Sequence, residues 1–565
     1  MSSTGPTNSG NRGRLMATAI LMSGIALFMI GWAVKLQVME TEFLQTQGEA
    51  RYLRVVSIPT VRGNILDRHG EALAVSTPVE SVWAHPGELL QAADRLPELA
   101  ELLGVDREAV ERRLTQRAQR EFVWLRRRIN PDLADQIRAL AIPGVFFQKE
   151  YRRFYPTGEV AAHLIGFTNI DDVGQEGLEL AYNQWLMGQP GSKRVIQDRL
   201  GRVVENVELV KEARPGRDLR LTVDRRLQYL AFRELKAAVQ NSEARSGSVV
   251  VMDVTNGDVL ALANFPGFNP NANQRVTSEG QRNRALTDVF EPGSIIKPFA
   301  IAAALESGLA DPDTRLDTTP GTMRVSGHTI RDIRNFGELS VTDILTKSSN
   351  VGVAELALSM DAEHLWGVYS RFGFGTVTGT GYPGESSGVL RDHERWRKLE
   401  QATLAYGYGL STTPLQMARA YAALADDGRL RQPRLIQDSD NRAQAVMEPR
   451  LARQMAEMLE TVTGPEGTGQ AARVPGYRVA GKTGTSRQVG AGGYEDRYSA
   501  SFAGFAPVSR PRVAVVVVLN DLVGQFYYGG QVAAPVFGNV MESALRLKNI
   551  PPDDVDTLLA RELKP

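Results

Sequence analysis

The sequence contains no cysteine, which excludes a disulfide, a thiol nucleophile and a thiolate metal site. Its six histidines are scattered, and no two of them have the H-x-x-x-H spacing of the common metal enzymes. Acidic and basic residues balance at 65 each, so no basic excess points to nucleic acid. We therefore predict a protein with no metal, no cofactor and no nucleic-acid partner.

Lysine is also scarce, because only 11 of the 65 basic residues are lysine and the rest are arginine. A lysine inside a motif is therefore more informative here than in an average chain. The length of 565 residues exceeds what one compact core accommodates, so two or three domains are expected.

An uncharged apolar run covers residues 15–34 and would span roughly 30 Å as a helix, the thickness of one hydrocarbon core. Arg12 and Arg14 precede the run, and Glu40 and Glu42 follow it. This asymmetry predicts a cytoplasmic N-terminus and an exported body. The run is too long for a signal peptide and no small-x-small cleavage site follows it, so we predict an uncleaved single-pass anchor.

The chain after the anchor changes its pattern at Pro215-Gly216, which predicts a domain boundary or linker. Residues 88–141 have a charge-rich helical pattern. Later segments predict strands at 219–223 and 513–519, a hairpin around Asn256-Gly257, and helices at 227–238 and 532–547. These elements predict an α+β domain over about residues 220–548, with helices on the faces of an antiparallel sheet.

Ser294 and Lys297 form the first candidate catalytic motif, S-x-x-K, which occurs once in the sequence. Pro and Gly precede Ser294 and an Ala-rich helical segment follows, so Ser294 is expected at a helix N-terminus. Lys297 lies one turn later on the same face. A serine hydroxyl is a weak nucleophile, and a desolvated lysine can lose its proton and act as its base. Taken alone, the motif also fits an ordinary solvated helix start.

Two further motifs follow in the chain. Ser348 and Asn350 form S-x-N, whose hydroxyl can relay a proton and whose amide can hold a substrate carbonyl, although Ser and Asn also favour ordinary caps and turns. An extended segment then contains Lys482-Thr483-Gly484-Thr485. There the lysine provides positive charge, both threonine hydroxyls can bind a carboxylate, and the glycine allows close approach. The alternative is a strand end with a solvated lysine.

The order and context of the three motifs favour an active site. They occur as S-x-x-K, S-x-N and K-T-G, the signature of penicillin-binding proteins and serine β-lactamases. The mechanistic hypothesis is that Ser294 attacks an acyl carbonyl while Lys297 takes its proton, directly or through Ser348. Backbone N–H groups of Ser294 and Thr485 would form the oxyanion hole.

The sequence resembles the class B penicillin-binding proteins over nearly its whole length, and most closely the division-specific D,D-transpeptidases of the penicillin-binding protein 3 or FtsI type. The resemblance rests on four further segments: R-G-N-I-L-D-R at 62–68, G-Q-E-G-L-E at 174–179, Y-G-Y-G-L at 406–410 and T-P-L-Q at 413–416. The elongation type usually has a G-Q-G variant in the third of these.

This resemblance implies an α+β protein with a transmembrane helix, an elongated β-rich pedestal and a transpeptidase domain like serine β-lactamases. The expected boundaries are a cytoplasmic tail at 1–14, the helix at 15–35, the pedestal at 36–218, the transpeptidase domain at 219–550 and a tail at 551–565. It also implies a location in the inner membrane at the division site, with the catalytic domain in the periplasm.

The resemblance further implies that the enzyme cross-links peptidoglycan stem peptides ending in D-alanyl-D-alanine and is inhibited covalently by β-lactams at Ser294. Its expected partners are a septal SEDS-family glycosyltransferase and other division proteins. Thr483 and Thr485 would hold the substrate carboxylate and Asn350 an amide carbonyl. The remaining expected pocket residues are Arg487, Tyr527 and Tyr528.

Four alternatives remain open from the sequence. A condition-specific paralogue of the septal enzyme would contain the same motifs. A D,D-carboxypeptidase would use water as the acceptor, although small hydrolytic members usually lack a large pedestal. A β-lactamase or β-lactam sensor would also acylate, but a resistance enzyme needs fast deacylation and we assign no separate deacylating carboxylate in the sequence. A non-catalytic division scaffold would not need Ser294, Lys297 and Lys482.

Overall fold

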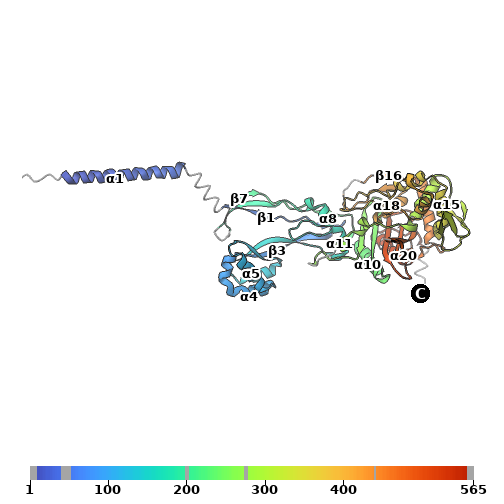
Figure 1. The fold of residues 1–565 in the computed structure, drawn as a ribbon, viewed down its shortest axis with the longest axis horizontal. Helices are drawn as coiled ribbons and strands as arrows, with labels where there is room; N and C mark the ends of the chain where they lie inside the picture. Colours follow the sequence, from blue (N-terminus) through green and yellow to red (C-terminus); the bar gives the residue numbers. More distant parts are fainter. Residues whose placement is uncertain are drawn as a thin grey trace, which may run out of the picture. The chain divides into compact units, whose positions relative to one another are not determined.

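The computed structural model describes residues 9–39, 53–197, 203–272, 278–437, 441–490 and 492–555 (Figure 1). Parts of the two predicted tails, 1–8 and 556–565, lie outside these residues. The N-terminal helix α1 (Ser9–Val34) continues into a short π-helical segment, and the stretch Gly13–Val38 has a mean hydropathy of 2.0 with no buried residue. Its length and composition fit the predicted single-pass membrane anchor.

The chain forms two compact units. The first comprises Met1–Thr60, Pro78–Glu150 and Gln189–Pro215, and the second comprises Val61–Thr77, Tyr151–Gly188 and Gly216–Pro565. Strands β3 (Ala72–Ala84) and β5 (Val145–Phe154) contribute residues to both units.

The first unit contains two substructures. One is an antiparallel sheet in the order β1 (Leu53–Ile58), β6 (Gly191–Gln197) and β7 (Val203–Lys211). In the other, an apolar core is shared by β4 (Val123–Ile129) and the helices α4 (Leu96–Leu103), α5 (Arg107–Gln116) and α6 (Pro131–Ala139). Asp106 caps α5, because its side chain accepts hydrogen bonds from the N–H groups of Glu108 and Ala109.

The prediction of helical structure throughout 88–141 is wrong at β4. Val123, Leu125 and Ile129 are buried against the helices, while Trp124 points away from that core and pairs with Trp83 of β3. The alternation of buried and outward side chains has the period of a strand. The arginines that follow Leu125 gave the segment the charged appearance of its helical neighbours.

The second unit is built around a five-stranded antiparallel sheet. Its order is β10 (Val259–Phe265), β9 (Ser246–Asp253), β19 (Val513–Leu522), β18 (Gly493–Ala506) and β17 (Ala480–Gly490). The predicted hairpin around Asn256-Gly257 is confirmed as β9 and β10, and the predicted apolar strand is confirmed as the central β19.

Helices cover both faces of this sheet, which explains why β19 is apolar at every position from 513 to 519. Val516 and Val518 pack into one core with α13 (Lys297–Glu306) and α18 (Pro414–Ala425). Val515 and Val517 pack into the other with α10 (Arg225–Asn241) and α20 (Gly529–Leu547). Successive strand residues face opposite sides, so a strand between two helical layers needs apolar side chains throughout.

The remaining elements of the second unit surround this sheet. They are α7 (Ala162–Ile165), α8 (Gly177–Ala181), α9 (Asn183–Leu186), β2 (Ile65–Leu66), β8 (Leu219–Arg220), α11 (Ser278–Gln281), α12 (Arg284–Thr287), β11 (Arg315–Asp317), β12 (Thr322–Val325), β13 (His328–Arg331), β14 (Glu338–Ser340), α14 (Val341–Lys347), α15 (Asn350–Leu358), α16 (Ala362–Arg371), α17 (Lys398–Leu404), β15 (Arg429–Arg431), β16 (Ala443–Ala445) and α19 (Pro449–Glu460).

The two motifs at 62–68 and 174–179 meet in a buried ion cluster of the second unit. Glu179 accepts hydrogen bonds from Arg62 Nε and Arg153 Nε, each at 2.6 Å, and all three side chains are at most 1% exposed. Arg62 also donates to the Asn183 side chain at 2.8 Å. These motif residues therefore join distant segments of the chain.

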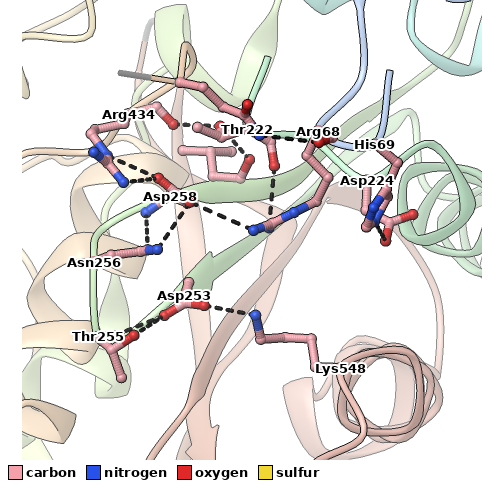
Figure 2. Close-up of polar contacts among 12 residues, drawn as sticks. Arg68, His69, Thr222, Asp224, Asp253, Thr255, Asn256, Asp258, Arg434 and Lys548 are labelled. Atoms are coloured by element: carbon pink, nitrogen blue, oxygen red, sulfur yellow. Dashed lines mark hydrogen bonds and ion pairs between the residues drawn. The ribbon is translucent and has the colours of Figure 1, made fainter. Parts of the chain in front are cut away.

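The motif at 62–68 also contacts the β9–β10 hairpin, as Figure 2 shows. Arg68 lies 3.8 Å from Asp258, which also pairs with Arg434 at 2.6 Å. His69 Nε2 lies 3.1 Å from the Asp224 carboxylate next to the start of α10. Residues 62–69 thus pack as part of the second unit, which contains the five-stranded sheet.

We expect Glu179→Gln to lower the free energy of unfolding by about 3 kcal/mol or more, because it leaves two buried guanidinium groups without their counter-charge. Thermal or denaturant unfolding in detergent would measure this change. The control is Glu108→Gln, which breaks the exposed 3.2 Å pair with Arg112 and should cost less than about 0.5 kcal/mol. Equal effects of the two substitutions would contradict the prediction.

Candidate active site

Ser294 lies in a single 3₁₀ turn, η4 (Gly293–Ile296), that runs directly into α13. Pro292 and the positive φ of Gly293 (55°) turn the chain immediately before the serine. Behind the turn, the buried hydroxyl of Tyr421 donates to the carbonyl oxygen of Ile295 at 2.8 Å. Ser294 is therefore held at the start of a helix, as predicted, with its side chain partly exposed.

The serine turn packs directly against the K-T-G strand β17. A Cβ atom on Gly293 would lie 3.0 Å from the carbonyl oxygen of Thr485. A Cβ on Gly484 would lie 2.3 Å from Ser501 Oγ and 3.0 Å from the carbonyl oxygen of Pro292. Gly484 is thus required by packing within the protein, in addition to the predicted approach of a substrate.

Lys297, the first residue of α13, is fully buried. Its Nζ donates hydrogen bonds to the carbonyl oxygen of Ser348 at 2.6 Å, to Asn350 Oδ1 at 2.8 Å and to Ser348 Oγ at 3.2 Å. S-x-x-K and S-x-N therefore come together although 54 residues separate Ser294 from Ser348 in the sequence.

The S-x-N motif covers the junction of two helices, α14 and α15. Ser348 ends α14 with a left-handed backbone (φ 62°), and Ser349 caps α15 through a 2.9 Å bond from the Gly352 N–H. Asp332 fixes this segment, because its carboxylate accepts hydrogen bonds from Ser349 Oγ at 2.6 Å and from the backbone N–H of Asn350. The motif thus includes a structural cap, Ser349, and two residues that face Lys297.

Lys482 completes the group. Its Nζ, also fully buried, donates to Ser348 Oγ at 2.9 Å and to Thr483 Oγ1 at 3.3 Å. Ser348 Oγ therefore lies within hydrogen-bond distance of two lysines from different motifs. This places all three predicted motifs in one site.

Burial changes the protonation of both lysines. It lowers the pKa of Lys297 well below the ordinary value of a lysine, and the charge of Lys482 lowers it further while Asp332 opposes the shift. Burial also lowers the pKa of Lys482 to about 7. At neutral pH the site can therefore contain a neutral amine on Lys297, which can accept a proton from a hydroxyl group.

Both threonines of β17 have their hydroxyl oxygens occupied by fixed donors. Gly529 N–H, at the N-terminus of α20, donates to Thr485 Oγ1 at 3.0 Å. Thr483 Oγ1 contacts Lys482 and also lies 2.7 Å from Thr468 Oγ1. Their remaining O–H groups, together with the positive end of the α20 dipole, suit a carboxylate.

The other expected pocket residues flank this position. Arg487 lies further along β17, forms an ion pair with Asp496, and its backbone N–H donates to the Tyr408 hydroxyl at 3.2 Å. Tyr527 stacks on Tyr498 with ring centroids 4.0 Å apart, and Tyr528 directly precedes α20. These residues therefore lie next to Thr485 and Gly529. Their contacts in the described structure do not indicate which ligand they would bind.

Sequence reasoning missed Asp332, Thr468 and Tyr421. Each acts through one hydrogen bond or a small set that depends on long-range packing. Asp332 follows β13 in a loop, and no local spacing distinguishes it from the many other acidic loop residues. Only their positions in the fold reveal them.

Two family descriptions match the chain: the penicillin binding protein transpeptidase domain over residues 247–542 and the penicillin-binding protein dimerisation domain over residues 57–221. The chain is 44% identical over 537 residues to the peptidoglycan D,D-transpeptidase FtsI of Escherichia coli K12, covering 94% of this chain and 91% of that protein.

The chain belongs to the penicillin-binding transpeptidase family. Among solved structures, the transpeptidase domain of Burkholderia pseudomallei penicillin-binding protein 3 is 41% identical with a TM-score of 0.54, covering 59% of this chain and 97% of that one. A peptidoglycan synthetase from Bifidobacterium adolescentis is 27% identical with a TM-score of 0.70, covering 89% and 98%. The expected fold class, an α+β transpeptidase domain with a pedestal and an N-terminal apolar helix, is therefore confirmed.

We expect binding of a carboxylate-bearing β-lactam to weaken as the pH rises through about 7, because the Lys482 ammonium is present below that pH and lost above it. The second-order rate of acylation should be measured from pH 5.5 to 8.5 with benzylpenicillin and with its methyl ester. The ratio of the acid's rate to the ester's should fall by about tenfold, the size of one charge-assisted hydrogen bond. Effects of Lys297 on both probes cancel in this ratio, so an unchanged ratio would contradict the prediction.

Proposed function

We propose that this chain is a peptidoglycan D,D-transpeptidase that cross-links stem peptides during septal cell-wall synthesis through an acyl-enzyme on Ser294. The observation that carries the proposal is the convergence of two buried lysines on Ser348 Oγ, beside the serine turn. Such a desolvated, pre-arranged set of amine and hydroxyl groups suits activation of a serine hydroxyl. Similarity to FtsI-type D,D-transpeptidases supports the substrate class.

In the proposed reaction, Ser294 Oγ attacks the carbonyl carbon of the penultimate D-alanine, and its proton passes to neutral Lys297, directly or through Ser348 Oγ. The C–N bond to the terminal D-alanine then breaks, and that amine leaves with the proton. The amine of a neighbouring stem attacks the resulting ester and gives its proton to Lys297. The new peptide bond forms and Ser294 regains its hydrogen.

The remaining residues would bind and polarise the substrate. The backbone N–H groups of Ser294 and Thr485 would form the oxyanion hole, which the close packing of Gly293 against Thr485 supports. Asn350 donates one side-chain N–H to the Arg331 carbonyl at 3.0 Å, so its second N–H would be free for a substrate carbonyl.

Thr483 and Thr485 would hold the terminal carboxylate near the positive charge of Lys482. Arg487, Tyr527 and Tyr528 would line the part of the site that holds the stem peptide. The same carboxylate contacts would serve β-lactams, which would acylate Ser294 and inhibit the enzyme.

The proposal includes a cellular setting. The tail at 1–14 would be cytoplasmic, 15–35 would span the inner membrane, and the pedestal (36–218) and transpeptidase domain (219–550) would be periplasmic, with 551–565 as a tail. The apolar helix α1 and the arginines that precede its apolar run support this orientation. Similarity to FtsI-type proteins supports a division-site location. The partners there would be a septal SEDS-family glycosyltransferase and other divisome proteins.

A fluorescent penicillin should label the full-length protein covalently, and Ser294→Ala should abolish labelling on a denaturing gel. Lys297→Arg should slow acylation by about 10²-fold or more, because an arginine cannot act as the base. Lys398→Arg is the matched control, since Lys398 is exposed and outside the site.

The outcomes separate the alternatives. Labelling that persists supports an acyl-enzyme with slow deacylation, whereas labelling that vanishes quickly indicates a β-lactamase. With stem peptides, release of D-alanine without cross-linked dimer indicates a carboxypeptidase. Unlabelled wild-type protein would contradict the active-site assignment and favour a scaffold.

The absence of cysteine allows a clean test of orientation. Single-cysteine variants Ser3→Cys and Lys398→Cys should be treated in intact spheroplasts with a membrane-impermeant maleimide. We expect labelling of Lys398→Cys alone, and labelling of both after the membrane is permeabilised. Labelling of Ser3→Cys in intact spheroplasts would contradict a cytoplasmic N-terminus.

A further inference from the structure

A loop outside the three motifs connects two of them. The segment 464–469, which we call the 464–469 loop, follows α19 and precedes β17 in the chain. At one end, Lys347 Nζ donates to the Glu466 carboxylate at 2.6 Å, and Lys347 directly precedes Ser348. At the other end, Thr468 Oγ1 lies 2.7 Å from Thr483 Oγ1. The loop thus touches both the S-x-N segment and the K-T-G strand.

The position of this loop is fixed by close packing. Gly469 N–H donates to the carbonyl oxygen of Val462 at 2.9 Å, and a Cβ on Gly467 would lie only 2.0 Å from that oxygen. A Cβ on Gly530 would lie 2.5 Å from the carbonyl oxygen of Thr468. The loop therefore packs against the first turn of α20, beside the position proposed for the substrate carboxylate.

The hydrogen bonds available to the Thr483 hydroxyl indicate a specific role for Thr468. A threonine hydroxyl has one hydrogen to donate and two lone pairs to accept with. Lys482 Nζ, which can only donate when charged, occupies one lone pair of Thr483 Oγ1 at 3.3 Å. If Thr468 donates to the second lone pair, the single O–H of Thr483 has no acceptor in this group and is directed to an incoming ligand.

The hydroxyl oxygen of Thr485 also has a fixed donor. The Gly529 N–H is a permanent donor to Thr485 Oγ1, which leaves the Thr485 O–H to donate elsewhere. Two parallel hydroxyl donors are the complement of a carboxylate, which only accepts. Because a fixed donor occupies each hydroxyl oxygen, the O–H groups do not adopt the alternative orientations that would compete with binding of the ligand.

We propose that Thr468 is a positioning residue for carboxylate recognition: its hydroxyl donates to Thr483 and thereby directs the Thr483 hydroxyl to the substrate carboxylate. This inference rests on the proposed function. Thr468 is exposed whereas Thr483 is 8% exposed, so Thr468 lies on the solvent side of the pair. Its substitution should therefore disturb packing little and recognition more.

The test uses the full-length protein in detergent micelles, with Thr468→Val to remove the hydroxyl and Thr468→Ser to retain it. Second-order acylation rates are measured with benzylpenicillin and with its methyl ester, which lacks the carboxylate. Thr468→Val should slow acylation by the acid about tenfold, the effect of one hydrogen bond to a charged group, and leave the ester's rate unchanged. Thr468→Ser should restore the acid's rate.

Thr115→Val is the matched control, because Thr115 is an exposed threonine of α5 whose hydroxyl bonds only to the Glu111 carbonyl in the described structure. It should change neither rate. An equal loss for acid and ester in Thr468→Val, no loss for either, or failure of Thr468→Ser to restore the rate would each overturn the inference. Failure of the wild-type protein to react with either probe would contradict the proposed function instead.

Discussion

Two buried lysines that share one serine hydroxyl are the interaction on which this site depends. Lys297 and Lys482 both lie within hydrogen-bond distance of Ser348 Oγ. Two ammonium groups at such distance in a desolvated space repel each other and lose hydration, so protonation of both is unfavourable. The protein keeps them there by supplying oxygen acceptors, and the outcome is a pKa below the ordinary lysine value for both amines.

This arrangement is demanding because each lysine comes from a different element. Lys297 begins α13, Lys482 lies on β17, and Ser348 lies between α14 and α15. Their separation is set by contacts outside the motifs: Asp332 holds the start of α15, Tyr421 holds the serine turn, and the 464–469 loop connects Lys347 with Thr483. A catalytic group of this kind therefore needs a rigid supporting layer.

The position of β17 at the edge of its sheet explains how such a buried group remains reachable. In the described sheet, β17 pairs only with β18, so no further strand covers its other edge, which faces the serine turn. An extended substrate can lie along that edge, with Thr483 and Thr485 at alternate positions facing the same side. The two helical cores behind the sheet fix the strand without covering that edge.

The range of the forces involved explains which parts of this structure could be predicted from the sequence. The β9–β10 hairpin, α10 and the central β19 were predictable, since turn chemistry and periodicity are local properties. The three motifs could be selected without coordinates because their chemistry is recognisable, and the structure brings Lys297, Ser348 and Lys482 together. β4 was mispredicted because tertiary pairing with β3 outweighed a charge-rich local pattern. Asp332 and Thr468 were missed because each is defined by contacts with residues distant in the sequence.

Ser348 shows why local rules fail at such a site. Its left-handed backbone (φ 62°) is a conformation that glycine adopts easily and that costs a non-glycine residue on the order of 1 kcal/mol. Glycine at that helix end would satisfy the backbone, but it would remove the oxygen that both lysines contact. The serine is therefore retained against its local preference, because the hydroxyl between the two amines contributes more to the site than the backbone strain costs.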